Sequence, residues 1–397
     1  MIFFVQLINL IYYIMHTLLF FAPLLVLTLG FDWTVGLHGS KLRGKCTGIL
    51  DNLSNGLINT FRSTVDTECP AVPAVPGDRR QDKTTIRLVQ YNVEWLFLDY
   101  YANADCPGDH CPWTTEAAAQ THMQYVSEVV KSLDPDIMNL CEVEGCDELN
   151  TLISELTTDQ TSTTSSPLYK PYLIKGTDTS TGQNVGLLTK IDPIKNLYRT
   201  EERANYPIPG SKCGYTGAPG TSGVSKHYIS EFMLGEIPVV MIGLHFLAYP
   251  TDTTRCAERE AQAQVIQNVI AKYWSNNYEI VVLGDFNDFD GEVLDANKNM
   301  PISQVLDIVK GKSGQMAGQY ELTSVASKII QSERYSDWWD ENGNCASTTS
   351  EFSMIDHILV SQTIQEHIVD SFIYKGYSEF CGTYNSDHYP VVVDFAI

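Results

Sequence analysis

The chain has 397 residues, of which 44% are hydrophobic and 19% charged, a composition typical of a globular protein. Its formal net charge of −22 argues against a simple nucleic-acid-binding module, because such modules use a basic surface to neutralise phosphates. An acidic enzyme that brings a cation to its substrate is compatible with this charge.

The first thirty residues are almost wholly apolar, with no Lys, Arg, Asp or Glu before Asp32. A signal peptide has an apolar core of about 7–15 residues, and initiation at Met15 would leave a core of that length from His16 to Gly30. A membrane span needs about 20 apolar residues, so an N-terminal anchor is the alternative. We therefore expect a secreted protein or, alternatively, one anchored and associated with the membrane through residues 1–30, with its body outside the cytoplasm.

Ten cysteines agree with export, because an even number in an exported chain predicts disulfides. Spacing alone does not fix their connectivity, and nearest-neighbour pairing would give Cys46–Cys69, Cys106–Cys111, Cys141–Cys146, Cys213–Cys256 and Cys345–Cys381. A bond between Cys141 and Cys146 would need a sharp turn, which Gly145 could supply. Two free, buried thiols are the alternative for this pair.

Residues 31–83 form a lead-in that ends in a proline-rich run and a charged stretch, typical of a linker or a surface wrap. The remaining residues, 84–397, are expected to form one catalytic domain. Strand patterns occur at 86–93, 136–143, 184–188, 238–246, 279–283, 353–360 and 390–395, and helices are predicted at 115–133 and 254–273. Many strands with few helices predict a layered α/β sandwich.

Polar side chains occur at the ends of several of these strands. They are Asn92, Glu142, His245, Asp285, Asn287, Asp356, His357, Asp387 and His388. Such side chains converge on one rim when the strands lie side by side. Mg²⁺ prefers oxygen ligands, and histidine can transfer a proton near neutral pH. The set therefore predicts a metal-dependent site for phosphodiester chemistry.

Six short motifs carry a resemblance to a known family. In chain order they are Tyr91-Asn92-Val93-Glu94, Leu140-Cys141-Glu142-Val143, Gly243-Leu244-His245, Gly284-Asp285-Phe286-Asn287, Ile355-Asp356-His357 and Ser386-Asp387-His388. They resemble the motifs of the endonuclease/exonuclease/phosphatase superfamily, from about Ile86 to the C-terminus. The resemblance implies a DNase I-like fold, a four-layer α/β sandwich of two packed, mostly antiparallel β-sheets flanked by helices.

The resemblance also implies a role for each motif residue. The metal-binding residues would be Asn92, Glu142 and Asp387. The catalytic residues would be His245, Asp285, Asn287, Asp356 and His388. Asp285 and Asn287 would position the attacking water and the phosphate. Asp356 would orient His388, and His245 would contact the phosphate or the leaving oxygen. Two residues depart from the commonest motifs, Cys141 in place of Gln and Glu94 in place of Asp.

These observations predict an Mg²⁺-dependent hydrolase, with Mn²⁺ or Ca²⁺ as alternative ions, that cleaves a phosphodiester without a covalent intermediate. DNA or RNA is the favoured substrate, and the enzyme is expected to be monomeric. One alternative is a secreted phospholipase acting on a phospholipid headgroup, such as a sphingomyelinase. Another is a catalytically silent binding protein on the same fold.

Other residues favour structural interpretations. His357 should face the opposite side of its strand from Asp356, and Trp95, Phe97 and Trp113 should pack in the core. Trp338 and Trp339 are expected to be exposed because their neighbours are polar. Arg259 is predicted to be a surface or ion-pairing residue, and Asp288 and Asp290 are predicted to be loop charges.

Overall fold

The computed structural model describes residues 68–98, 111–157, 168–338, 340, 344, 348–377 and 384–396. All of them belong to one structural unit, Thr64–Ile397. The predictions for residues 1–30, for residues 31–67 of the lead-in, for Trp339, and for Cys46, Cys106, Cys345 and Cys381 fall outside the described residues. Among the residues described, no helix is both long enough and apolar enough to cross a membrane.

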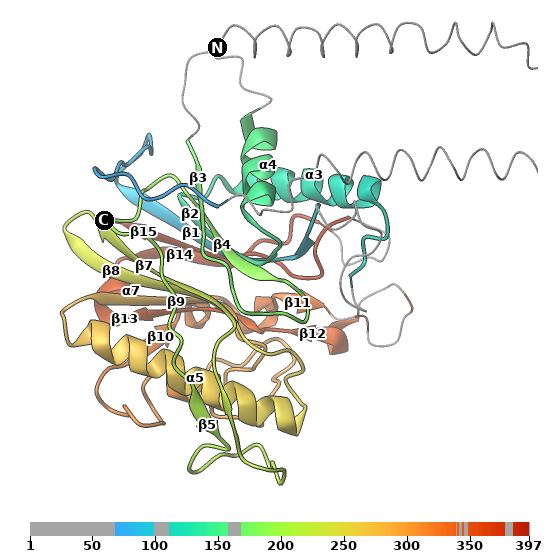
Figure 1. Cartoon of the computed structure of the whole chain (residues 1–397), viewed down its shortest axis with the longest axis vertical. Coiled ribbons are helices and arrows are strands. Elements are labelled where there is room, and N and C mark those ends of the chain that lie inside the picture. The colour runs from blue at the N-terminus through green and yellow to red at the C-terminus, as the bar shows by residue number, and fades with distance from the viewer. Residues whose placement is uncertain are drawn as a thin grey trace, which may run out of the picture. The chain divides into compact units, whose positions relative to one another are not determined.

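Two mixed β-sheets form the centre of the fold (Figure 1). The first contains, in spatial order, β14 (Ile368–Ile373), β15 (Val391–Ala396), β1 (Thr85–Leu96), β2 (Ile137–Val143), β4 (Asn184–Thr189) and β3 (Lys170–Leu173). The second contains β10 (Leu322–Ser324), β13 (Asp356–Ser361), β9 (Glu279–Asp285), β8 (Ile237–His245) and β7 (Lys226–Leu234). Each sheet has one parallel pair, β1–β2 and β8–β9. The other pairings in these sheets are antiparallel, as predicted.

Alternation along the strands divides the core into layers. Leu88 and Val281 point into the space between the two sheets. Their neighbours point outward, Val89 toward one pair of helices and Val282 toward another. The helices are α3 (Glu116–Leu133) and α4 (Cys146–Thr157) on the first sheet, and α5 (Thr253–Trp274) and α6 (Val305–Val309) on the second. The result is the predicted four-layer α/β sandwich.

The two predicted helices are present. The side chain of Thr115 caps α3 by accepting from the N–H of Ala118, and Asp134 ends the helix in a left-handed conformation. The second helix, α5, does not have the solvated polar face expected of an amphipathic helix, because its glutamines are buried. Gln267, for example, donates to the carbonyl oxygens of Ile308 and Ser313. A chain segment therefore covers this face of α5.

Several short elements were not predicted, because they lack a sustained apolar pattern. They are β3, β5 (Ala204–Tyr206), β6 (Gly220–Ser222), β7, β10, β11 (Asp337–Trp338), β14, α4, α6, α7 (Gln362–Glu366), and the 3₁₀ turns η3 (Val325–Lys328), η4 (Gln331–Glu333) and η5 (Thr349–Glu351). The strand predicted over 353–360 is divided into β12 (Phe352–Ser353) and β13.

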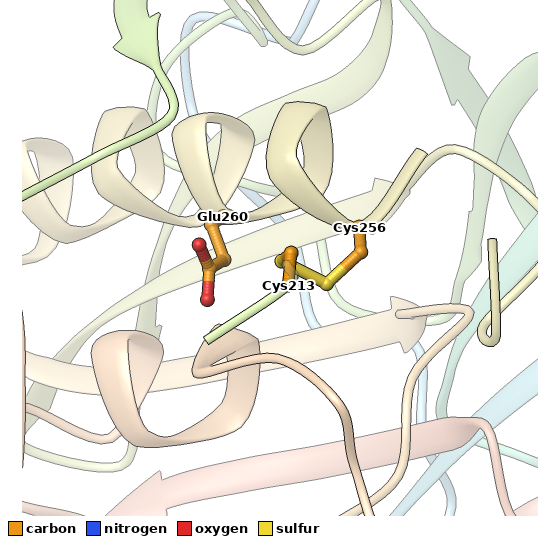
Figure 2. A group of neighbouring side chains, drawn as sticks. All are labelled: Cys213, Cys256 and Glu260. Carbon is orange, nitrogen blue, oxygen red and sulfur yellow. A yellow bond between two sulfur atoms is a disulfide. The ribbon is translucent and has the colours of Figure 1, made fainter. Parts of the chain in front are cut away.

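The cysteine pairing corrects two predictions. Cys69 is bonded to Cys146, so the nearest-neighbour pairs Cys46–Cys69 and Cys141–Cys146 are both wrong, and Cys141 is a free, buried thiol. Strand alternation explains this, because Cys141 lies in the core between the sheets, whereas Cys146 begins α4 on the outer face. The predicted bond between Cys213 and Cys256 is confirmed (Figure 2).

The described end of the lead-in lies against the first sheet. The Cys69–Cys146 disulfide attaches it to α4. Farther along, Gly77 donates its N–H to Asp192, and Arg79 donates its N–H to the carbonyl of Lys190. This stretch is a surface wrap, while the predicted domain boundaries themselves stay a prediction.

Candidate active site

Asn92, near the end of β1, contacts residues from both sheets. Its Nδ2 donates to Glu142 Oε1 at 3.2 Å and to Asp285 Oδ2 at 3.0 Å, and lies 3.5 Å from His388 Nε2. Glu142 is on β2, Asp285 ends β9, and His388 precedes β15. Parallel pairing places the carboxyl ends of β1 and β2 together, and likewise those of β8 and β9. The two sheets therefore build one site at their common rim.

His388 is oriented by a buried carboxylate. Its Nδ1 lies 2.7 Å from Asp356 Oδ2, which also accepts from Ser336 Oγ at 2.8 Å. Gln90 donates to the other oxygen of Asp356 at 3.0 Å. Burial alone would lower the pKa of His388, but the facing carboxylates of Asp356, Asp387 and Asp337 raise this pKa well above the usual value. His388 is therefore an imidazolium at neutral pH, with Nε2 facing the site.

The second histidine, His245, is in the opposite electrostatic situation. Its Nε2 lies 3.6 Å from Asp285, 3.9 Å from Glu142 and 3.5 Å from the Nζ of Lys226. Burial, and after it the charge of Lys226, lowers the pKa of His245 well below the usual value. His245 is therefore neutral at neutral pH.

Lys226, on β7, was not predicted as a site residue. It is only 9% exposed, donates to Gln183 at 3.1 Å and lies 3.8 Å from Asp178. It pairs in register with His245 across β7 and β8. Sequence reasoning missed it because β7 itself was not recognised. Lys226 supplies a buried positive charge beside His245 and Glu142.

Three acidic side chains share the β1–β2 side of the site. Glu94 accepts the N–H of Asp387 at 3.0 Å, and Glu142 accepts the N–H of Trp95 at 3.2 Å. Burial raises the pKa of all three carboxyls, and the charges of Asp387 and Glu142 raise that of Glu94 further. Within the described part of the chain, no Lys or Arg forms an ion pair with any of them. Such an oxygen-rich cluster suits a hard divalent cation.

The backbone is bent where these acids occur. Glu94 and Glu142 have φ values of 51° and 67°, in the left-handed region that non-glycine residues rarely adopt. Strained conformations of this kind concentrate at functional sites. At Gly284, with φ of 154°, a Cβ would lie 1.9 Å from the carbonyl oxygen of Leu244. Only glycine fits there, directly before Asp285.

Asp285 and Asn287 form the last part of the site. The N–H of Asn287 donates to Asp285 Oδ1 at 2.8 Å, and its side-chain amide donates to the carbonyl of Phe246 at 3.2 Å. Burial and then the charge of Asp356 raise the pKa of Asp285 to about 8. Its carboxyl can therefore accept or release a proton near neutral pH.

All eight predicted site residues lie in this one cluster, while their individual roles stay predictions. Within this cluster, two groups of three have ligand atoms within 4.8 Å of one another, namely Asp285/Asp356/His388 and Asp337/Asp387/His388. Neither contains Glu142. Both need His388, whose Nδ1 is already bonded to Asp356, so the oxygen ligands around Glu142 and Asp387 fit a hard cation better.

Asp337 is a further acid that sequence reasoning missed. It pairs with His388 in a β-bridge, and its Oδ1 lies 3.8 Å from His388 Nε2. Burial raises the pKa of Asp337 to about 7. Its polar neighbours had suggested exposure, and that prediction is wrong for Trp338 as well, which is 6% exposed.

The other structural predictions have mixed outcomes. His357 does face away from Asp356, with Nε2 3.0 Å from the carbonyl of Asp288. Trp95, Phe97 and Trp113 pack together in the core, as expected. Arg259 is ion-paired, one of its two predicted roles, and Asp288 and Asp290 do lie in a loop. What was not predicted is that all three are buried, Asp288 paired with Arg259 and Asp290 with Lys310.

The profile of the Endonuclease/Exonuclease/phosphatase family matches residues 89–388. The chain belongs to this family. It is a phosphoesterase of the nuclease or phosphodiesterase type, and enzymes of this family typically use a divalent metal. Its disulfides are typical of an oxidising extracellular or lumenal compartment.

Solved structures show similarity at low sequence identity. A truncated TDP2 from Caenorhabditis elegans is 13% identical, with a TM-score of 0.45, over 79% of this chain and 98% of that chain. The 3′-5′ exonuclease NExo from Neisseria meningitidis is 15% identical, with a TM-score of 0.47, over 79% and 100%. A Neisseria NExo described as a 3′ phosphatase bound to a product DNA hairpin is 14% identical, with a TM-score of 0.46, over the same shares. No curated protein matches this sequence.

Proposed function

We propose that this family member is an exported, divalent-metal-dependent phosphodiesterase that hydrolyses DNA or RNA. One observation carries the proposal: Glu94, Glu142 and Asp387 form a partly buried acidic cluster without an ion-paired Lys or Arg among the described residues, directly beside an Asp–His pair. Buried like charges without a partner are costly. A bound cation would remove that cost.

The residues that would hold Mg²⁺, or Mn²⁺ or Ca²⁺ in its place, are Asn92, Glu142 and Asp387, with Glu94 beside them. When bound, such an ion polarises a phosphoryl oxygen and stabilises the charge that develops on it.

The chain's own groups account for the proton transfer. A water molecule attacks phosphorus while Asp285, whose pKa is about 8, accepts its proton. The N–H of Asn287 fixes the carboxylate of Asp285. The new P–O bond forms as the bond to the leaving oxygen breaks, and His388 stabilises the departing oxygen with its Nε2 hydrogen. Neutral His245 and the cation of Lys226 face the remaining phosphate oxygens.

The test is to incubate the purified protein with plasmid DNA, RNA and sphingomyelin vesicles, with and without a chelator. We expect cleavage of nucleic acid that the chelator abolishes. In Glu142→Gln, most activity should be lost without unfolding and partly restored at high metal concentration, because the amide keeps the size of the side chain but not its charge. Cleavage of sphingomyelin alone would assign the phospholipase activity instead. Binding without cleavage of any substrate would indicate a silent family member.

A further inference from the structure

The loop between β8 and α5, residues 246–252, holds an aromatic side chain in solvent. Tyr249 is 51% exposed and has φ of 69°, a conformation that few aromatic residues adopt. Within this loop, which is described in full, Tyr249 is the only exposed large hydrophobic residue. The positive φ of Tyr249 and the exposure of its side chain both need a structural cause.

Buried Arg259 on α5 fixes this loop. Its Nη1 donates to the carbonyl oxygens of Leu247 (3.1 Å), Ala248 (3.1 Å) and Tyr249 (2.9 Å). Its Nη2 donates to the carbonyl of Pro250 at 2.8 Å. Four consecutive carbonyls thus bind one planar guanidinium, whose fixed geometry suits such recognition. A change in the backbone conformation at Tyr249 would break these bonds.

The same loop is bonded to the catalytic segment. Phe246 donates its N–H to the carbonyl of Asp285 at 2.9 Å, and Asn287 donates its amide to the carbonyl of Phe246 at 3.2 Å. Arg259 Nε donates to Asp288 at 3.1 Å. Tyr249 is also only four residues beyond His245. The backbone that carries Tyr249 is therefore held in place beside the segment that carries Asp285 and His245.

A cation accompanies the ring. The Cζ of Arg255, which is exposed on the first turn of α5, lies 6.0 Å from the ring centroid of Tyr249. An exposed aromatic ring with an Arg is the combination that binds a single-stranded nucleotide, because the ring stacks on the base and the Arg binds phosphate. Docking to a lipid surface would need several apolar side chains together, and this loop offers one.

We propose that Tyr249, with Arg255, forms a stacking subsite for a nucleobase next to the scissile phosphate. This inference deepens the proposed function and depends on it, because it names unpaired nucleotides as the preferred substrate class. Tyr249 would act on substrate binding rather than on the proton transfer.

The test uses two oligonucleotides of the same length, one with all bases and one with an abasic tetrahydrofuran residue on each side of the cleaved phosphate. Tyr249→Ala should raise KM about 5- to 150-fold on the first, the range for the loss of one stacked base, and about twofold or less on the second. Tyr249→Phe keeps the ring and should behave as wild type. Arg255→Gln should raise KM by a smaller factor. Trp274→Ala, which removes an exposed aromatic residue at the far end of α5, is the matched control.

The outcomes separate the two proposals. If the wild-type protein cleaves neither oligonucleotide, the proposed function fails. If the wild-type protein cleaves both oligonucleotides, the proposed function stands. The stacking subsite is then wrong if Tyr249→Ala has the KM of wild type, or if its KM rises by the same factor on both substrates. A lowered kcat with unchanged KM would also contradict it. Since Tyr249 is exposed, melting temperatures near that of wild type will show that each variant is folded.

Discussion

Buried carboxylates occur in two kinds of surroundings in this molecule. Asp192, at the edge of the first sheet, accepts from Arg79 at 2.7 Å, Tyr172 at 2.8 Å and Lys170 at 3.1 Å. Burial alone would raise its pKa, but these donors and the N–H of Gly77 lower it. Asp290 is similar, because the charge of Lys310 lowers its pKa against the effect of burial.

The site carboxylates Asp285, which is buried, and Glu142, which is partly buried, have different partners. Glu142 accepts hydrogen bonds from the side chain of Asn92 and the N–H of Trp95, and Asp285 accepts them from the side chain of Asn92 and the N–H of Asn287. Burial raises the pKa of both. This difference distinguishes carboxylates that stabilise the fold through ion pairs from carboxylates whose charge a bound cation would neutralise. The predictions below test that separation.

The largest expected effects come from the histidines. His388→Ala and His245→Ala should each lower the rate by about 10²–10⁴-fold, the usual range for a positioned acid–base group. His357→Ala should cost far less in rate, because its ring bonds Asp288 on the outer side of the sheet. Steady-state kinetics on one oligonucleotide compares the three. If His357→Ala were the most damaging, the assignment of faces around Asp356 would be wrong.

Asp192→Asn tests the carboxylates that have cationic partners. It should lower the free energy of unfolding by about 1.5–3 kcal/mol, the range for hydrogen bonds to a charged group, and leave the rate per folded molecule unchanged. Urea unfolding together with kinetics measures both quantities. A loss of activity without a loss of stability would show that Asp192 is not a carboxylate that stabilises the fold.

The pH dependence of stability should have opposite signs for the two groups. A raised native pKa means that Asp285 holds its proton more strongly in the folded, metal-free protein, so its contribution to stability falls as pH rises from about 4 to about 8, by about 1.4 kcal/mol per pH unit at most. Asp285→Asn should flatten this decline. Asp290 has a lowered native pKa, so its contribution is lost as pH falls below about 4, and Asp290→Asn should flatten only that acid limb. Melting curves in chelator across pH 3–9 measure how stability depends on pH in each variant. The same pH dependence in Asp285→Asn and Asp290→Asn would refute the distinction between the two kinds of carboxylate.

The sequence predicted the sandwich and the convergence of the eight motif residues, because these residues follow regular apolar strands and their convergence required only correct strand assignment. It did not predict Lys226, since β7 is a strand whose polar residues are buried and give no clear alternation. Asp337 was missed because polar neighbours suggested a loop in solvent. The bond between Cys69 and Cys146 joins residues 77 apart in sequence, a contact set by tertiary packing rather than by local spacing.

The most direct test of the central claim is a calorimetric titration of Mn²⁺ into the metal-free protein, compared with Glu142→Gln and Asp192→Asn. If the unpaired acids form a divalent metal site, wild type and Asp192→Asn should bind the ion with the same affinity, and Glu142→Gln should bind it far more weakly. No saturable heat with the wild-type protein, or equal affinity in Glu142→Gln, would contradict the account.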